Sequence, residues 1–102
     1  KKPWRMIYHA FNGQQWRVFG ATSSDRGATW VRDGGVLLDA GPEGAFDSKG
    51  CGTRSVARWR GGLVMVYEGV DEAMTHRLCA AFCTDPDGDY ERNGGWEKMH
   101  SL

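Results

Sequence analysis

Short apolar runs, separated by Gly, Asn or Asp, recur along the whole sequence. Residues 6–8 and 63–67 are rich in β-branched and aromatic residues, a composition typical of β-strands. A further strand is expected over residues 52–59, followed by a turn at residues 60–62. No stretch has the 3.6-residue periodicity of an amphipathic helix. The pattern therefore predicts an all-β fold, with strands that are apolar on both faces and covered on both sides.

The sequence also repeats itself. Residues 5–9 (RMIYH) align with residues 64–68 (VMVYE) at an offset of 59, and residues 17–21 (RVFGA) align with residues 77–81 (RLCAA) at an offset of 60. A fixed period indicates an architecture in which each unit stacks on its neighbours. Because each copy contains several short strands, the repeat predicts a β-propeller, which is a ring of four-stranded antiparallel blades.

The repeat divides the chain into about two consecutive blades, with strands A to D counted from the axis outward. Residues 1–45 would form a blade that lacks its innermost strand and contributes strands B to D. Residues 46–102 would form a complete blade, strands A to D, of the same propeller. Since repeat proteins generally need at least about three units, we expect a longer chain or several subunits to complete the ring.

Charge and hydropathy narrow the range of partners. Lys plus Arg and Asp plus Glu number 13 each, so no basic field favours nucleic acid. No apolar run approaches the roughly 20 residues that a membrane-spanning helix needs. We therefore expect neither a nucleic-acid partner nor a membrane span, and the sequence indicates no compartment.

The three cysteines are Cys51, Cys79 and Cys83. On one strand, Cys79 and Cys83 would lie about 13 Å apart, beyond the roughly 7 Å limit between the Cα atoms of a disulfide. We expect packing thiols. His76 has the right chemistry to join them on zinc, but an extended chain directs His76 and Cys79 to opposite faces. No metal site and no cofactor are expected.

Residues 23–30 (SSDRGATW) match S-x-D-x-G-x-T-W, the pattern of the Asp box in sialidase-type blades. The resemblance implies a hairpin turn between outer strands, remote from any active site. Asp25 would accept hydrogen bonds from backbone amides, Gly27 would supply a positive φ and Trp30 would pack beneath the hairpin. Ser23 and Thr29 complete the motif.

The second copy has Thr-Asp-Pro-Asp-Gly-Asp-Tyr at residues 84–90, with carboxylates at alternate positions. Such a run of carboxylates could suggest a calcium site. An EF-hand loop that began at Asp85, however, would need Gly where Tyr90 stands and Glu where Trp96 stands. Because this segment aligns with the Asp box, we expect a turn here as well.

Two phrases indicate a family. Residues 46–56 (FDSKGCGTRSV) and 63–69 (LVMVYEG) resemble W/F-D-S-x-G-V-G-D-P-S-V and Y-K-M-W-Y-T-G in the propellers of glycoside hydrolase families 32 and 43. These families include arabinanases, levansucrases and invertases. The resemblance implies five blades around a central pocket that is faced by the start of each innermost strand.

The resemblance also selects candidate site residues. Where the relatives have Asp-Pro, this chain has Thr53 and Arg54, and neither can replace a catalytic carboxylate. Arg54 could bind an anionic or hydroxyl-rich ligand through its planar fork of donors, or it could pair with Asp47 or Glu68. Glu68 and His9 share one repeat position at a strand end. The pocket-facing candidates are Asp47, Thr53, Arg54, Glu68 and His9.

Two functions are compatible with these observations. The first is a glycoside-hydrolase-like propeller that binds carbohydrate or a related polar ligand, whose catalysis would depend on carboxylates from other blades. The alternative is a non-catalytic propeller that serves as a docking or structural subunit in a larger assembly, since a fold does not dictate function. The tryptophans could stack on sugars or fill the core in either case.

Overall fold

The computed structural model describes residues 2–83 and 95–99, apart from the side chain of Thr53. These residues form seven strands: β1 (Trp4–Phe11), β2 (Trp16–Ser23), β3 (Val31–Leu38), β4 (Gly50–Trp59), β5 (Gly62–Val70), β6 (His76–Cys83) and β7 (Glu97–Lys98). The prediction of an all-β fold is confirmed. Within the same residues, no helix is long and apolar enough to cross a membrane.

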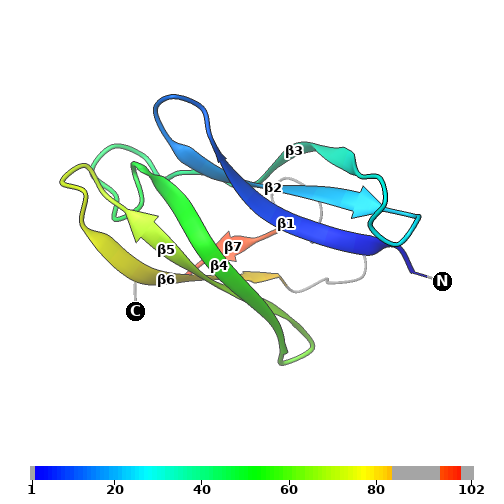
Figure 1. The fold of residues 1–102 in the computed structure, drawn as a ribbon. Coiled ribbons are helices and arrows are strands. Elements are labelled where there is room, and N and C mark those ends of the chain that lie inside the picture. Colours follow the sequence, from blue (N-terminus) through cyan, green and yellow to red (C-terminus); the bar gives the residue numbers. More distant parts are fainter. Residues whose placement is uncertain (1, 84–94, 100–102) are drawn as a thin grey trace.

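The strands form two antiparallel meanders (Figure 1). In the first meander, β2 pairs with both β1 and β3. The second meander runs in the order β4-β5-β6-β7. A single parallel bridge between Trp16 and Gly50 joins the meanders into one mixed sheet that is not closed.

Gly50 makes the junction possible. Its φ of 151° is one that residues with side chains rarely adopt, and a Cβ there would lie 2.5 Å from the Trp16 nitrogen. The chain therefore passes from one meander to the other at a point where only glycine lets the two backbones approach. The β4–β5 hairpin turns at Arg60 and Gly61, within the predicted turn.

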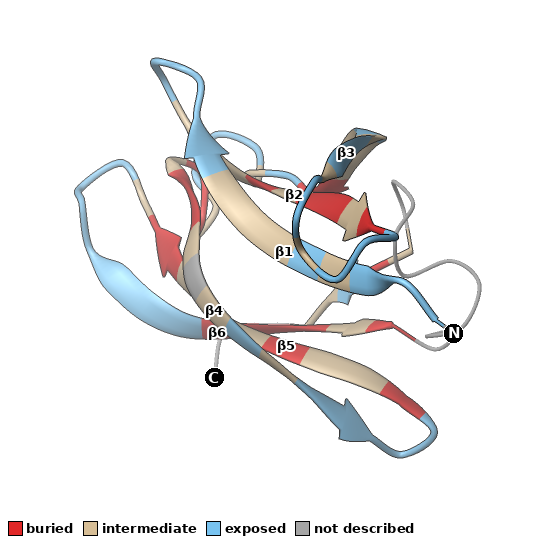
Figure 2. Cartoon of the chain, turned by 45° about the vertical axis from the view of Figure 1, so that its right-hand side comes forward, coloured by how far each residue is buried: buried red, intermediate tan, exposed pale blue. Residues whose placement is uncertain are grey.

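The core lies between the two meanders (Figure 2). One face of β5 and β6 supplies fully or almost fully buried side chains, and β2 and β3 supply the opposite wall. These residues are Met65, Tyr67, Cys79, Ala81 and Cys83 from the second meander, and Val18, Leu37 and Leu38 from the first. The alternate positions Val64 and Val66 are only half-buried, so the expectation that both faces are covered is not met within the described chain.

The three cysteines are buried and form no disulfide with one another, which confirms the expectation that Cys79 and Cys83 are packing thiols. Burial raises the pKa of the Cys51 thiol to about 12 and also raises that of Cys79. Both groups therefore stay protonated at neutral pH and pack as small apolar side chains.

The β2–β3 connection is the turn formed by residues 23–30. Asp25 Oδ1 accepts hydrogen bonds from the Thr29 amide and the Ser23 hydroxyl, each at 2.8 Å. The Thr29 hydroxyl donates to Asp25 Oδ2. These bonds, those from Thr29 first, lower the pKa of Asp25 to about 2, so the carboxylate remains charged over the whole ordinary pH range.

Gly27 and Trp30 complete this turn. Gly27 has a φ of 90°, and its amide donates to Ser23 Oγ at 2.7 Å. The Trp30 indole Nε1 donates to the Gly27 carbonyl at 3.1 Å. The ring of Trp4, on β1, lies close to the position that a Cβ on Gly27 would occupy. The equivalent segment of the second copy, residues 84–90, lies outside the described residues.

Candidate ligand-binding groove

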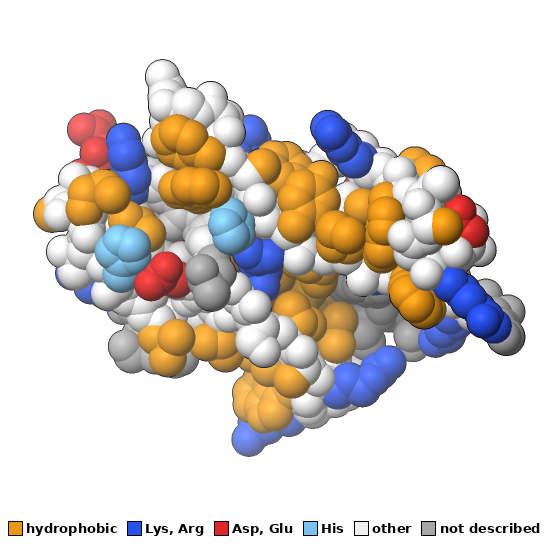
Figure 3. Space-filling model, in the orientation of Figure 1, with side chains coloured by type: hydrophobic (Ala, Val, Ile, Leu, Met, Phe, Trp, Pro, Cys, Tyr) orange, Lys and Arg blue, Asp and Glu red, His pale blue; other side chains and the backbone are white. Residues whose placement is uncertain are grey.

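An open groove of about 450 Å³ lies on the second meander. Its charged groups and its imidazole come from Arg54 on β4, Glu68 near the end of β5, and His76 and Arg77 at the start of β6. The remaining lining residues are Ser55, Val66, Tyr67 and Leu78. The turn between β5 and β6 returns the chain directly, so Glu68, which pairs with Leu78, and His76, which pairs with Val70, are diagonal neighbours on one face of the hairpin. Figure 3 shows histidine, acidic and basic side chains close together on this side of the molecule.

Arg54 is held in place by the first meander. Its Nη1 donates to the Ile7 carbonyl at 2.9 Å, and its Nη2 contacts His9 Nδ1. Nε is buried and has no hydrogen-bond partner among the described residues. Arg54 therefore does not form the alternative pair with Asp47 or Glu68, because β1 offers it a carbonyl and an imidazole nitrogen instead.

His9 is suited to accept this contact. Burial, and secondarily the Arg54 charge, lowers the pKa of His9, which keeps the ring neutral at neutral pH. A neutral imidazole has one nitrogen lone pair to offer a guanidinium donor. The His9 ring also packs edge-to-face with Trp16, and the two ring centroids lie 5.0 Å apart.

Glu68 and His76 form the exposed part of the groove. Glu68 Oε2 lies 3.1 Å from His76 Nδ1, with the side chains 44% and 50% exposed. A pair this exposed contributes little to stability and can rearrange around a ligand. The sequence interpretation considered His76 only as a zinc ligand. Its position across the β5–β6 turn from Glu68 was the signal that could have found it.

Asp47, in contrast, is absent from the groove lining. It is 1% exposed, and its Oδ2 accepts hydrogen bonds from Tyr67 Oη at 3.1 Å and Lys98 Nζ at 2.7 Å. The Cys51 thiol points at the same oxygen from 3.7 Å. The structure thus places this candidate inside the fold, as a group that joins β4, β5 and β7.

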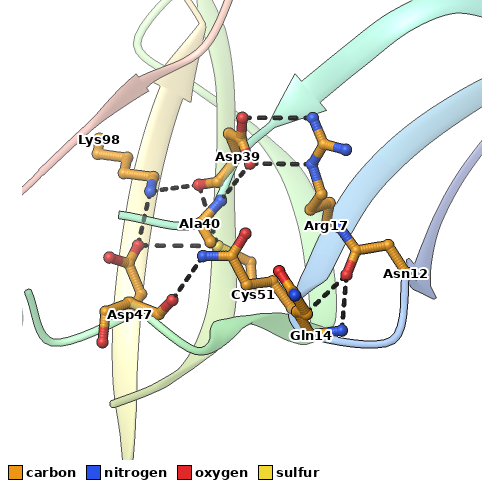
Figure 4. A network of polar contacts seen from close by, with 10 residues as sticks. Asn12, Gln14, Arg17, Asp39, Ala40, Asp47, Cys51 and Lys98 are labelled. Atoms are coloured by element: carbon orange, nitrogen blue, oxygen red, sulfur yellow. Dashed lines mark hydrogen bonds and ion pairs between the residues drawn. The ribbon is translucent and has the colours of Figure 1, made fainter. Parts of the chain in front are cut away.

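The loop between β3 and β4 is built around this carboxylate (Figure 4). Lys98 Nζ also donates to the Asp39 carbonyl, and Arg17 Nε donates to Asp39 Oδ1 at 3.0 Å. The Asp47 carbonyl accepts hydrogen bonds from the amides of Gly41 and Gly50, each at 3.1 Å. The network explains why Asp47 points inward: its charge is balanced by Lys98, a residue that the sequence interpretation missed.

Thr53 lies in β4 where the register with β5 shifts, between Gly52 and Arg54. Its side chain lies outside the described part of the structure. The structure therefore brings Arg54 and His9 into contact, places Arg54 and Glu68 in one groove, adds His76 and Arg77, and separates Asp47 from them. Among the described residues, no group of three or more potential ligands could hold a metal ion.

Comparison of the sequence with protein-family models and with curated proteins finds no match. The chemistry of the groove must therefore be read from its own residues. It offers two guanidinium groups, one carboxylate and one imidazole, and in the described structure Glu68 is the single carboxylate in its lining. Hydrolysis of a glycosidic bond ordinarily uses two carboxyl groups about 5–9.5 Å apart.

Proposed function

We propose that this chain is part of a β-propeller related to glycoside hydrolase families 32 and 43, and that its groove binds carbohydrate or a similarly hydroxyl-rich ligand. The support for the propeller is the 59–60-residue repeat together with the two antiparallel meanders. Support for the family comes from the phrases at residues 46–56 and 63–69.

The observation that carries the binding proposal is the environment of Arg54. Its guanidinium is fixed by a carbonyl and an imidazole rather than neutralised by a carboxylate. Each Nη atom has a second N–H besides the one directed at β1, and these donors, in one groove with the exposed acceptor Glu68, can bind adjacent hydroxyl groups, which both donate and accept hydrogen bonds. Because the geometry exists before a ligand arrives, little ordering cost opposes binding.

We propose binding without hydrolysis by these residues. Glu68 alone cannot act both as the acid and as the base or nucleophile of a glycosidase. His76 is a proton carrier, but it is not a stabiliser of the positive charge that develops on the sugar ring.

Isothermal titration calorimetry with arabino- and fructo-oligosaccharides tests this proposal. Arg54→Ala should weaken binding about tenfold or more, because hydrogen bonds to a charged group are worth about 1.5–3 kcal/mol. Arg58→Ala, which removes an exposed arginine on the same strand outside the groove lining, is the matched control and should bind normally. Glu68→Gln gives a second variant at an exposed position.

Equal affinity of the Arg54→Ala and Arg58→Ala variants would refute the assignment. Chromatography of the sugars after incubation addresses hydrolysis separately. The intact oligosaccharide should be recovered, whereas release of shorter products by the wild-type chain would contradict the non-hydrolytic part of the proposal.

A further inference from the structure

The first meander has an apolar face that the described chain covers only in part, since Met6 on it is 38% exposed while Ala21 is 3% exposed. Met6 pairs with Ala21 and Tyr8 with Phe19, so the four side chains share one side of β1 and β2. With Trp30 they line a groove of about 680 Å³. We call Met6, Tyr8, Phe19 and Ala21 the outer face. Hydrophobic side chains gather on the surface in Figure 3 where Figure 1 places β1.

The same face of the second meander is buried. The repeat aligns the outer face with Met65, Tyr67, Cys79 and Ala81, all of which are 0% exposed. They pack on the reverse side of the first meander, against Ile7, Val18 and the end of β3. In the second copy of the repeat, this face is therefore covered by the reverse side of a neighbouring meander. We expect the outer face of the first copy to be covered in the same way.

The second meander has that reverse side, and the residues that the structure describes cover it only in part. The repeat aligns Ile7 with Val66 and Val18 with Leu78, which we call the receiving face. Val18 is 0% exposed in its contact with the second meander, whereas Leu78 is 59% exposed. On the outer face, Met6 is 38% exposed, whereas the aligned Met65 of the second meander is 0% exposed. The described part of the chain therefore carries both halves of one interface, each of them partly uncovered.

We infer that two copies of this chain associate head to tail, with the outer face of one on the receiving face of the other. The contact between the two meanders within the chain is the template for this docking. Such an interface is heterologous, so further copies can add in the same way and a ring forms where the rotation closes. The inference rests on the packing and not on sugar binding, but because Val66 and Leu78 also line the groove, docking and ligand binding there would exclude each other.

Docking would fill part of the candidate groove, because Val66 and Leu78 of the receiving face also line it. In the template contact, Val18 is fully covered while its neighbour His9 remains half-exposed. Leu78 and Glu68 occupy the equivalent positions. A second copy would therefore cover the Leu78 side of the groove and leave Glu68 exposed, so a docked copy and a ligand would compete for this groove.

Sedimentation velocity of the 102-residue chain over a range of micromolar concentrations tests the inference. Wild type should shift from monomer to larger species as the concentration rises. Met6→Glu places a charge on the outer face and Leu78→Glu places one on the receiving face, so each variant alone should remain monomeric. Met74→Glu, an exposed position in the β5–β6 turn outside both faces, should associate like wild type.

The decisive step is an equimolar mixture of the two blocked variants. Met6→Glu retains an intact receiving face and Leu78→Glu an intact outer face, so the mixture should form a 1:1 dimer and nothing larger. The dimer also demonstrates that both variants are folded. Tyr8→Arg and Val66→Arg provide a second pair if circular dichroism shows that either first variant is unfolded.

Three results would overturn the inference. The first is a wild-type chain that is monomeric at every concentration. The second is self-association of Leu78→Glu by itself, which would indicate a symmetric contact between two outer faces. The third is a mixture of folded blocked variants that stays monomeric.

Discussion

The guanidinium of Arg54 on β4 contacts the imidazole of His9 on β1, 45 positions earlier in the chain. The contact joins the two meanders at the groove and needs a neutral histidine, because a protonated ring would place two cations side by side. Positioning of the candidate ligand donor and packing between the meanders therefore depend on one protonation state.

This dependence predicts a loss of stability at mildly acidic pH. The pKa of His9 is lowered in the folded state, so the unfolded chain binds the proton more readily. The contribution of His9 to stability is fully present above its unfolded value of 6.5 and is lost as the pH falls through the folded value. Urea denaturation at neutral pH and at about pH 5.5 should show this loss.

The variant His9→Asn isolates the effect from other titrating groups. Its side-chain oxygen can accept from Arg54 but cannot take up the proton, so this variant should lose less stability than wild type over the same pH interval. An equal loss in wild type and His9→Asn would show that the pH dependence arises elsewhere.

Asp47→Ala should be strongly destabilising. The replacement leaves the buried Tyr67 hydroxyl without its acceptor and Lys98 without its ion-pair partner. An orphaned buried group costs about 1–3 kcal/mol, which is large beside the total stability of a small domain. Glu43→Ala, at an exposed position in the same loop, is the control for chemical denaturation and should leave the midpoint unchanged. Similar midpoints for both variants would contradict the role given to Asp47.

Gly27→Ala should weaken the turn between β2 and β3. Its φ of 90° disfavours any side chain, and a Cβ would lie 3.1 Å from the Trp4 ring. We expect a cost of about 1 kcal/mol or more, as for alanine placed where φ is positive. Gly34→Ala is the matched control, since a Cβ there meets nothing within 4 Å and its φ is not in the strained range. Equal melting temperatures for Gly27→Ala and Gly34→Ala would show that the stability of the fold does not depend on glycine at position 27.

Much of the fold could be predicted because it depends on local patterns. The β-branched and aromatic runs marked β1 and β5, and the S-x-D-x-G-x-T-W pattern marked the turn after β2. The glycine pair after Arg60 marked the β4–β5 hairpin. In each case, neighbouring residues determine the backbone conformation, so a single sequence contains the information.

The candidate site was less predictable because its contacts are long-range. Pairing with a carboxylate was one of the two alternatives for Arg54, but the side chain reaches the Ile7 carbonyl, which no side-chain pattern marks. Asp47 was expected at the pocket, but Lys98 draws it into the interior from 51 positions away. Ion-pair partners are chosen by the packing of distant strands, and alternation of apolar residues does not specify that packing.

The most direct test of the central claim is an NMR titration of the ¹⁵N-labelled chain with an arabino-oligosaccharide. If the groove is the binding site, amide shifts should change progressively around Arg54, Glu68 and His76, and the same titration of Arg54→Ala should lose these changes. The Asp-box amides around Asp25 serve as the internal control and should stay constant. Saturating shifts confined to the outer face around Met6 and Phe19, or no shifts at all with either arabino- or fructo-oligosaccharides, would contradict the account.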